Sequence, residues 1–402
     1  MSREVWVLEA RRTPIGRFCG ALAPLGAVDL GVAAVRGLAA ALAPRWEGGA
    51  AGVLREVEQT IFGVARQAGL GPNPARQIAV RAGVPVERPA WTVNMACASG
   101  LKAVALGAAA ILAGEAELVL AGGTESMTNV PHLLPGLRRG SRLGHLEVPD
   151  AMYRDGFACP LAGMLMGETA DLLARERGID RARCDAWAAQ SQQRCERARR
   201  SGRFAREIVP VELPAAPGAA PVRVLADEHP RDGVTPEKLA QLPPVFGAYG
   251  VTTAGNASGI NDGAAAVLLA EAGWARARGL EPLARLGAWA EAALEPERMG
   301  LGPVPAVRRL LARTGCGLEA YEQIELNEAF AAQVLACVDE LGLDPERVNP
   351  DGGAIALGHP IGCTGARLVT TLAHGLAVRG GRRGLVTLCV SGGLGMALEL
   401  CR

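Results

Sequence analysis

Residues 90–123 read AWTVNMACASGLKAVALGAAAILAGEAELVLAGG, and this stretch decides the fold class. Ala90–Asn94 has the composition of a strand, whereas Ser99–Ala113 is a run of Ala, Leu, Val and Ile that predicts a helix. Glu117–Gly123 is apolar along most of its length and predicts a buried strand. A strand, a helix and a second strand in succession predict a sheet with helices on its faces.

The rest of the chain follows the same alternating plan on both sides of this stretch. The N-terminal part predicts strands at Val5–Leu8 and Val57–Val64, and helices at Asp29–Leu42 and Pro74–Ala82. The C-terminal part predicts a strand at Ile324–Leu326, a helix at Gly365–Arg379 and a strand at Leu385–Val390. A chain of 402 residues is long for one compact core, so we expect two or more domains.

Two segments far apart in the chain look alike. Ala98-Ser99-Gly100 opens a helix that is followed by a buried strand ending in Gly122-Gly123. Cys363-Thr364-Gly365 opens another helix, and the buried strand after it runs into Gly392-Gly393. The likeness indicates a duplicated α/β unit.

The amino-acid composition changes between the two halves, where residues 128–250 contain many prolines, arginines and polar stretches. Residues 210–221 are typical of a loop or linker. One face of a predicted helix in this region carries, at helical spacing, Cys184, Trp187, Ala188, Ser191, Cys195 and Ala198. This face predicts packing of an accessory subdomain rather than a functional site.

The composition excludes several function classes. A formal net charge of +1, without a long run of one sign, argues against a nucleic-acid or membrane-surface protein, although a local basic patch for a phosphorylated ligand stays open. No apolar run is expected to reach membrane-spanning length, and residues 1–14 lack the core of a signal peptide.

The cysteines and histidines do not predict a metal site or disulfides. The ten cysteines are irregularly spaced without a Cys-x-x-Cys pair, and the five histidines form no metal-binding pair. We therefore expect a reducing cytoplasm in which most thiols are small buried hydrophobes. The sequon Asn256-Ala257-Ser258 is weak evidence for glycosylation in such a chain.

Cys97 lies between the strand and the helix of residues 90–113. A thiol at a helix start is close to free N–H groups and to the positive end of the helix dipole, and both favour the nucleophilic thiolate. The alternative is a structural cysteine of the core, which is the commoner role.

The segment 349–362 reads NPDGGAIALGHPIG and is far more specific. Its glycines allow tight backbone geometry, and they hold one histidine, His359, between Gly358 and Pro360. This histidine could be a base for a thiol or a donor to a thioester oxygen. The alternative is a histidine that caps a turn.

Two further segments could complete a site. Cys389 ends a buried strand before Ser391-Gly392-Gly393, so it could move a proton while the backbone N–H groups face an oxyanion. Asn327, at another strand end, could orient a water or hold an oxyanion. The alternatives are a core cysteine before a flexible loop, and an asparagine that caps a helix.

Together these segments resemble the motifs of the thiolase family, in family order and over essentially the whole chain. The matching segments are Met95-Ala96-Cys97-Ala98-Ser99-Gly100, Asn327-Glu328-Ala329-Phe330, Gly358-His359-Pro360, Cys389-x-x-Gly392-Gly393-x-Gly395, residues 251–266 and the opening Arg11-Arg12-Thr13-Pro14-Ile15-Gly16. The resemblance implies two similar α/β halves, each with a mixed five-stranded sheet, in a helix–sheet–helix–sheet–helix arrangement. It implies an N-terminal half at 1–127 completed by about 259–281, a coenzyme A-binding loop domain at 128–258, and a C-terminal half at 282–402.

The resemblance also implies a role for each matching residue. Cys97 resembles the acylated nucleophile, His359 its activator, Cys389 the acid/base at the acetyl methyl, and Asn327 the residue that fixes a water in the first oxyanion hole. The amides of Cys97 and Ser391 resemble the second oxyanion hole. Residues that match positions near coenzyme A or the acyl group are Arg231, Ala254, Ser258, Met166, Ala329 and Phe330.

The implied reaction is a reversible Claisen condensation of acetyl-CoA with an acyl-CoA, and its reversal by free coenzyme A, as in fatty acid metabolism and β-oxidation. No cofactor is permanently bound; the partners are acetyl-CoA, a 3-ketoacyl-CoA, coenzyme A and further copies of the chain in a homodimer or homotetramer. Two departures stand out: Ser391 where many relatives have Gly, and Leu165 where short-chain relatives often have His.

Two other functions compete with this interpretation. A ketoacyl synthase-like condensing enzyme of the same superfold would pair its cysteine with two histidines or with histidine and asparagine, whereas the second acid/base here is Cys389. A non-catalytic acyl-CoA-binding protein would have no need of both Cys97 and His359.

Overall fold

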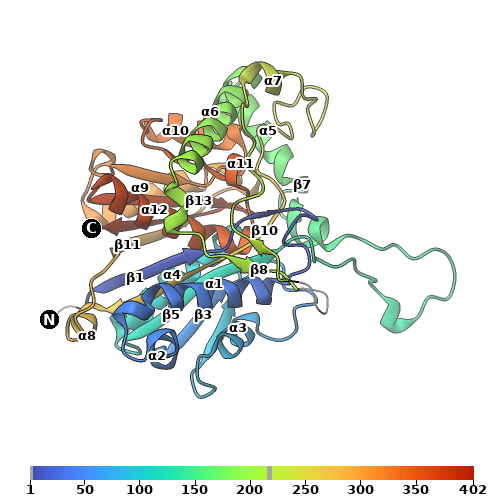
Figure 1. The fold of residues 1–402 in the computed structure, drawn as a ribbon. Coiled ribbons are helices and arrows are strands. Elements are labelled where there is room, and N and C mark those ends of the chain that lie inside the picture. The colour runs from blue at the N-terminus through green and yellow to red at the C-terminus, as the bar shows by residue number, and fades with distance from the viewer. Residues whose placement is uncertain (1–2, 215–219) are drawn as a thin grey trace.

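The computed structural model describes residues 3–214 and 220–402 as a layered α/β structure (Figure 1). One group of strands runs, in spatial order, through β1 (Val5–Arg12), β10 (Asn261–Glu271), β5 (Leu118–Ser126), β3 (Gln59–Gly63) and β4 (Ala90–Val93). The second group runs through β12 (Gln323–Leu326), β13 (Arg383–Val390), β14 (Leu394–Cys401) and β11 (Ala284–Ala293). The predicted α/β class with two similar halves is confirmed.

Both strand groups are mixed. The pairs β3–β4, β3–β5 and β12–β13 are parallel, and the other neighbours are antiparallel. The first group has the expected five strands, whereas the second has four and a parallel bridge from Ile324 to Val348 at its edge. The groups also join at one corner, where Val5–Val7 pair with Ala284–Leu286.

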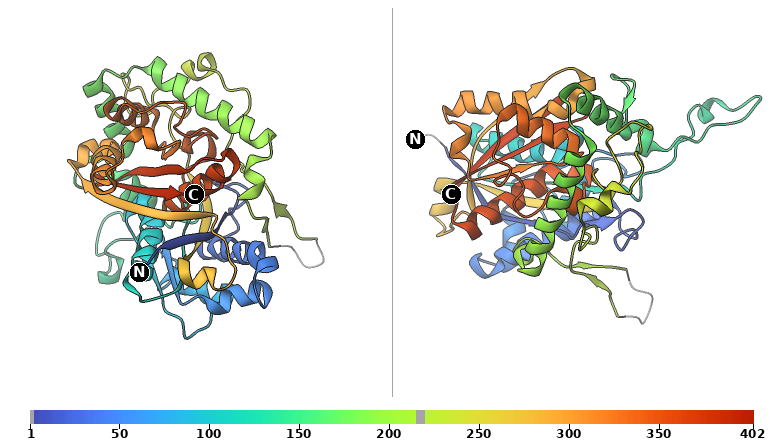
Figure 2. Two further views of the ribbon diagram at one scale, coloured as in Figure 1. Left: turned by 90° about the vertical axis from the view of Figure 1, so that its left-hand side faces the viewer. Right: turned by 90° about the horizontal axis from the view of Figure 1, so that it is seen from above.

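Helices fill three layers around the two strand groups (Figures 1 and 2). The outer layer of the first group consists of α1 (Ala27–Leu42), α2 (Gly49–Glu56) and α3 (Pro74–Ala82). The central layer consists of α4 (Ser99–Ala113) and α12 (Ile361–Arg379). The outer layer of the second group is built on α9 (Pro303–Thr314) and α10 (Ala331–Leu341).

The central helices cross very closely, because glycines stand at the contact. A Cβ on Gly100 of α4 would lie 2.8 Å from the Ala366 nitrogen, and one on Gly365 of α12 would lie 2.2 Å from the Leu101 nitrogen. These glycines belong to the two similar segments of the sequence. The duplication therefore places the starts of α4 and α12 side by side.

Two buried helices correct one expectation from the sequence. Residues Ala27–Arg45 and Ala96–Ala113 are each long and apolar enough to span a membrane by length and composition, so the expectation of no such run was wrong. Both lie mostly in the core, with 56% and 61% of their apolar windows buried. Core helices packed on several sides have this same composition, so the finding is weak evidence for a membrane.

The segment between the halves carries its own helices and a long arm. Its helices are α5 (Met166–Arg177), α6 (Arg181–Arg200) and α7 (Pro236–Ala240), and the predicted face of α6 is buried as expected. Residues 128–150 extend away from the body as an arm (Figures 1 and 2). Short elements complete the chain: β2 (Gly16–Arg17), β6 (Ala158–Cys159), β7 (Met164–Leu165), α8 (Ala272–Arg276) and α11 (Ala354–Leu357).

The loop predicted at 210–221 can be compared with the structure only in part. Residues 215–219 lie outside the described residues. On either side of them, β8 (Val211–Glu212) pairs with β9 (Arg223–Val224), so the start of the predicted loop is a short strand instead. Val211 is buried in the core of the N-terminal half, which favours this pairing over a free linker.

Candidate active site

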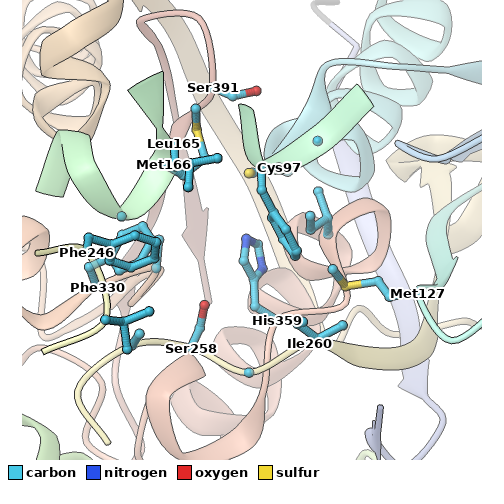
Figure 3. Close-up of a pocket in the computed structure, with 18 of the residues that line it drawn as sticks. Cys97, Met127, Leu165, Met166, Phe246, Ser258, Ile260, Phe330, His359 and Ser391 are labelled. Carbon is cyan, nitrogen blue, oxygen red and sulfur yellow. The ribbon is translucent and has the colours of Figure 1, made fainter. Parts of the chain in front are cut away.

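A cavity of about 340 Å³ collects side chains from both halves and from the segment between them (Figure 3). Cys97, His359, Cys389 and Ser391 all line it. The structure therefore brings Cys97 together with two segments that are 262 residues or more away in the chain, as the difference between positions 97 and 359 shows. Asn327 lies just behind His359 and does not line the cavity itself.

The backbone before α4 presents Cys97 on a tight turn. Ala96 has a φ of +43°, a conformation that is strained for a residue with a side chain. Ser99 holds the turn from inside, because its Oγ donates to the Ala96 carbonyl at 2.6 Å and accepts from the Met95 amide at 2.9 Å. Asn94 also accepts from the Ala96 amide at 2.9 Å. The turn thus points the thiol away from the core and into the cavity.

Cys97 is not the ready-made thiolate that its place at a helix start led us to expect. Burial raises the pKa of its thiol, and this effect outweighs the positive charge of Arg66 and the hydrogen bonds from the backbone amides of Ser391 and Cys97. The resting thiol therefore keeps its proton. A nearby base has to take this proton when the sulfur attacks.

The His359 loop is clamped by the N-terminal half. The His359 amide donates to Oδ1 of Asn261 at 2.9 Å, and Asn261 donates in turn to the Gly16 carbonyl at 2.9 Å. Gly358 has a φ of +103°, and a Cβ there would lie 2.5 Å from the Asn261 side chain. The glycine before the histidine is thus required by the contact between halves.

The hydrogen bonds around His359 fix which ring nitrogen is free. Nδ1 lies 2.6 Å from Oγ1 of Thr364, and this hydroxyl donates its single proton to the Pro360 carbonyl at 2.9 Å. Thr364 must therefore accept from Nδ1–H, which leaves Nε2 without a proton. Burial lowers the pKa of His359 to about 3, helped by the charges of Arg367 and Arg66, so the ring is neutral at pH 7.

His359 does not cap the helix that follows it, because α12 has Pro360 at its N-cap and no side-chain capping bond. Its Nδ1 bonds instead to the side chain of Thr364 in the first turn of α12. Its Nε2 faces Nδ2 of Asn327 at 3.5 Å, and the ring also lines the cavity. A neutral imidazole with a free Nε2 can take a proton from a thiol.

Cys389 is a second thiol on the same cavity. It is 1% exposed, ends β13 beside Met299 and Ala329, and the negative charge of a Cys97 thiolate would act on it. Burial, followed by this repulsion from Cys97, raises the pKa of the Cys389 thiol well above its usual value. It is thus a core cysteine and a cavity residue, and in the resting site it carries a proton.

The loop after Cys389 keeps its amide geometry despite the serine. The left-handed φ angles fall on Gly392 and Gly393, at +86° and +82°, and not on Ser391. A Cβ on Gly393 would lie 2.2 Å from the Leu294 carbonyl, so this position does require glycine. The departure from the family glycine at 391 therefore costs no strain, and the Ser391 amide still faces the Cys97 sulfur.

Asn327 is not a helix cap. The N-cap of α10 is Phe330, three residues further on, so the capping alternative was wrong. Asn327 is fully buried at the end of β12, and its Oδ1 has no hydrogen-bond partner among the described residues. Its side-chain amide therefore faces His359, and its Oδ1 is still able to accept a hydrogen bond.

The predicted substrate residues divide between two neighbouring cavities. The first cavity is lined by Met166, Ala254, Ser258, Ala329 and Phe330, and also by Leu165. A second cavity of about 250 Å³ is lined by Arg231, His229 and Lys238. Ala254 lines both, so the two cavities meet at this residue. Arg231 is thus close to the site but outside its reactive part.

The loop of Ala254 and Ser258 is held by the asparagine of the sequon. Asn256 is 1% exposed and donates to Asp185 of α6 at 2.9 Å and to the Val251 carbonyl at 2.9 Å. Its Oδ1 accepts from the Thr253 amide at 2.8 Å. All its polar atoms serve the loop, which leaves no accessible amide for a glycan.

Glu328 holds the segments around the site together, a role that the sequence did not reveal. Its buried carboxylate accepts from Trp187 Nε1 at 3.0 Å and Ser191 Oγ at 2.7 Å, both on α6. It also accepts from Asn349 Nδ2 at 3.0 Å and from the Ile355 amide at 3.1 Å. One side chain thus fastens α6 to the segment that carries His359.

We expect Glu328→Ala to unfold at a clearly lower temperature than the wild type. The change leaves four buried donors without their acceptor, and each orphaned group costs about 1–3 kcal/mol. Thermal unfolding followed by circular dichroism measures the effect. Glu281→Ala, at an exposed carboxylate, is the control and should unfold like the wild type. An unchanged unfolding temperature for Glu328→Ala would show that the network contributes little.

Two more residues of the site were missed from the sequence. Thr364 fixes the His359 tautomer. This role becomes visible only in the folded structure, where the start of α12 places the Thr364 hydroxyl beside the histidine ring. Arg66 lines the cavity from the end of β3, where sheets of this class commonly carry functional side chains. Its position shortly after a predicted strand could have identified Arg66 as a candidate site residue from the sequence.

The cysteines and acidic groups add no metal site in the part of the chain that the structure describes, where no cluster of three candidate ligands is found. All ten cysteines are free thiols. Those that are buried are Cys159, Cys184, Cys195, Cys337, Cys363 and Cys389.

Comparisons with known proteins find relatives over the whole chain. Residues 5–273 match the family model for the thiolase N-terminal domain, and residues 280–402 match that for the thiolase C-terminal domain. An acetyl-CoA acetyltransferase of Pseudomonas aeruginosa is 48% identical, with both chains covered completely. The cytosolic acetyl-CoA acetyltransferase of mouse is 43% identical over 99% of this chain and 98% of its own.

Solved structures give the same result. The Bacillus anthracis acetyl-CoA acetyltransferase has a TM-score of 0.94 and 40% identity, covering 100% of this chain and 99% of its own. Human mitochondrial 3-ketoacyl-CoA thiolase has a TM-score of 0.92 and 37% identity, covering 99% and 98%. Matches to both domain models and to relatives over their full length show that this chain belongs to the thiolase family.

Proposed function

We propose that the protein catalyses the reversible transfer of an acyl group between coenzyme A and an acetyl-CoA carbon, through a thioester on Cys97. The observation that carries the proposal is the meeting of two protonated thiols and one neutral imidazole in a single cavity. Two thiols can divide the work, so that one carries the acyl group and the other moves a proton.

In the cleavage direction, the reaction starts at the C3 ketone of a 3-ketoacyl-CoA. His359 Nε2 takes the proton of the Cys97 thiol as the sulfur bonds to C3. Burial disfavours both the thiolate and the imidazolium, so the neutral pair is the resting state and the proton moves as the bond forms. The C2–C3 bond then breaks, and its electron pair forms the enolate of acetyl-CoA.

Cys389 completes this half of the reaction. Its thiol donates a proton to C2 of the enolate, which leaves as acetyl-CoA. Free coenzyme A then gives its thiol proton to Cys389 and takes the acyl group from Cys97, which regains its proton from His359. Condensation is the same sequence reversed, with Cys389 removing a methyl proton.

Two groups of polar donors stabilise the developing oxygen charges. The amides of Cys97 and Ser391 form one oxyanion hole beside the reacting sulfur. Asn327 supports the other by orienting a water beside His359, a role for which its unpartnered Oδ1 is suited. Neither hole requires a metal or a permanently bound cofactor.

The second cavity binds the nucleotide end of coenzyme A. Arg231 and Lys238 supply positive charge for its phosphates, and the shared Ala254 connects it to the reactive cavity. Ser258 and Met166 then lie along the pantetheine arm, and Ala329 and Phe330 lie at the acyl end. Leu165 makes the wall apolar where short-chain relatives often have histidine, which favours a broader acyl range than acetoacetyl-CoA alone.

The test is thiolysis of a 3-ketoacyl-CoA series, from acetoacetyl-CoA upward, with condensation of acetyl-CoA assayed alongside. We expect coenzyme A-dependent cleavage of at least one member and release of acetyl-CoA. A ketoacyl synthase-like enzyme would instead require an acyl carrier protein and would not consume coenzyme A. A non-catalytic acyl-CoA-binding protein would bind the substrates unchanged.

We expect Ser391→Gly to keep most activity and Ser391→Pro to lose about 10²–10³ in turnover, because proline has no N–H for the oxyanion. Thiolysis rates measure both variants, after thermal unfolding has shown that the proline variant is folded. A folded Ser391→Pro enzyme with wild-type turnover would exclude this amide from the oxyanion hole. A nearly inactive Ser391→Gly would mean that the hydroxyl is the working group.

Self-association and a cytoplasmic location are also part of the proposal. The arm at 128–150 exposes apolar side chains that a second copy could cover in a homodimer or homotetramer: Leu134, Leu137, Leu143, Leu146 and Val148. Ten free thiols suit a reducing compartment.

A further inference from the structure

Arg66 is a buried cation on the wall of the reactive cavity that the proposed reaction does not use. It lies three residues after the end of β3 at Gly63 and is only 8% exposed. Its Nε is buried and has no hydrogen-bond partner among the described residues. A guanidinium in such a place ordinarily has an acceptor, because an unpaired buried donor is costly.

The fold makes room for this guanidinium. A Cβ on Gly156 would lie 2.3 Å from Nη2 of Arg66 and 2.6 Å from its Nε, so the missing side chain at Gly156 leaves the space that the guanidinium occupies. The neighbouring wall is apolar, with Met127, Phe157 and Ile260 lining the same cavity. The charged head therefore lies against a glycine and apolar side chains, with little of the protein to bind.

The carboxylate of Glu125, which interacts with Arg66 electrostatically, is already occupied. Glu125 accepts from the Ala65 amide at 3.1 Å, the Arg66 amide at 3.1 Å and the Gly362 amide at 2.9 Å. The charge of Glu125 interacts with Arg66 electrostatically, but the hydrogen bonds of its carboxylate go to backbone amides rather than to the guanidinium. Within the described part of the chain, Arg66 thus has the charge of Glu125 acting on it electrostatically, and its Nε has no direct acceptor.

Arg66 lines the reactive cavity and does not line the coenzyme A cavity. That cavity joins the reactive one at Ala254, in the loop that also carries Ser258. In Figure 3, Ser258, Phe246 and Phe330 lie on one side of Cys97, and Met127 and Ile260 lie on the other. Met127 and Ile260 belong to the apolar cluster of Ala65, next to Arg66 in the chain.

We infer that Arg66 is a specificity-determining residue that binds a carboxylate on the acyl chain, so the preferred substrates are 3-ketoacyl-CoA esters derived from dicarboxylic acids. The inference rests on the proposed function. A carboxylate matches the planar donor fork of arginine, and the apolar surroundings strengthen such a pair. A plain alkyl chain in the same place would leave the buried donors unpartnered.

The test compares substrate pairs that differ only in the terminal group. 3-Oxohexanedioyl-CoA is paired with 3-oxohexanoyl-CoA, and 3-oxooctanedioyl-CoA with 3-oxooctanoyl-CoA, while acetoacetyl-CoA serves as a common reference. The wild type should prefer the carboxylate in at least one pair. Arg66→Met should lower the ratio of kcat/KM for that substrate to kcat/KM for its alkyl partner about 10²-fold, as expected for loss of a buried charge pair, because any effect of the lost charge on Cys97 is common to both members. Arg66→Lys should recover part of the loss.

Controls separate this inference from the proposed function. Arg382→Met removes an arginine whose side chain is 89% exposed and should not alter the ratio within a pair. An equal loss for both members in Arg66→Met would show that Arg66 acts on Cys97 rather than on the chain end, and would overturn the inference. No preference in the wild type, with normal thiolysis of acetoacetyl-CoA, would overturn it as well. Absence of thiolysis with every substrate would instead contradict the proposed function itself.

Discussion

Cys97→Ala is expected to lower acyl transfer by about 10⁴-fold or more while leaving the fold intact, because the variant has no atom that can carry the acyl group. The turn before α4 is held by Ser99 and Asn94 and not by the thiol, so alanine fits without rearrangement. The loss should therefore be visible in turnover and absent from thermal unfolding.

Mass spectrometry after incubation with acetyl-CoA measures the underlying step directly. The wild type should gain one acetyl group on the peptide that contains Cys97, and Cys97→Ala should gain none. Cys316→Ala, at a half-buried thiol away from the cavity, should be acetylated like the wild type. An adduct on Cys389 alone, or an active Cys97→Ala enzyme, would reverse the assignment of the nucleophile.

Cys389→Ala is expected to accept an acetyl group on Cys97 but to condense acetyl-CoA about 10²–10⁴ times more slowly, the usual contribution of a positioned acid or base. Acylation uses Cys97 and His359, which the change does not touch, whereas the enolate forms only if a second group removes a methyl proton. Because the pKa of the buried Cys389 thiol is raised, the thiol keeps its proton until the more basic enolate takes it, and in the other direction its thiolate is a strong base.

Exchange of the acetyl methyl hydrogens in heavy water reports that proton transfer alone. The exchange should be fast in the wild type and slow in Cys389→Ala, although both enzymes form the acetyl adduct. Cys337→Ala is a close control, because Cys337 is buried near Cys389 but donates to the Gly300 carbonyl and does not line the cavity. Normal exchange in Cys389→Ala would exclude it as the acid/base.

Local signals in the sequence were enough for much of the fold. The helices at Pro74–Ala82 and Ser99–Ala113 begin and end where they were predicted. The first has proline in its first turn, an Asn73 side chain that accepts from the Arg76 amide, and Gly83 in a left-handed conformation at its end. The helix predicted from Gly365 begins earlier, at Ile361, because Pro360 can occupy its N-cap.

Long-range contacts set what local signals could not. The pairing of β1 with β11 joins positions about 280 residues apart in the chain, for example Val5 with Leu286. Within the site, the residue types Cys97, His359 and Cys389 pointed to their chemistry. The protonation state of Cys97 did not follow from its helix position, because burial by distant segments outweighs the local dipole. The same reason hid Glu328, whose partner Trp187 is 141 residues away.

The close crossing of α4 and α12 also bears on how activity arises during folding. Cys97 belongs to one half, His359 and Cys389 to the other, and Gly100 and Gly365 set the contact that brings the two helix starts together. A chain in which only one half has folded can hold every helix of that half and still lack a site. The helical signal in circular dichroism therefore reports the folding of each half. The reactivity of the Cys97 thiol toward substrate reports the docking of the two halves.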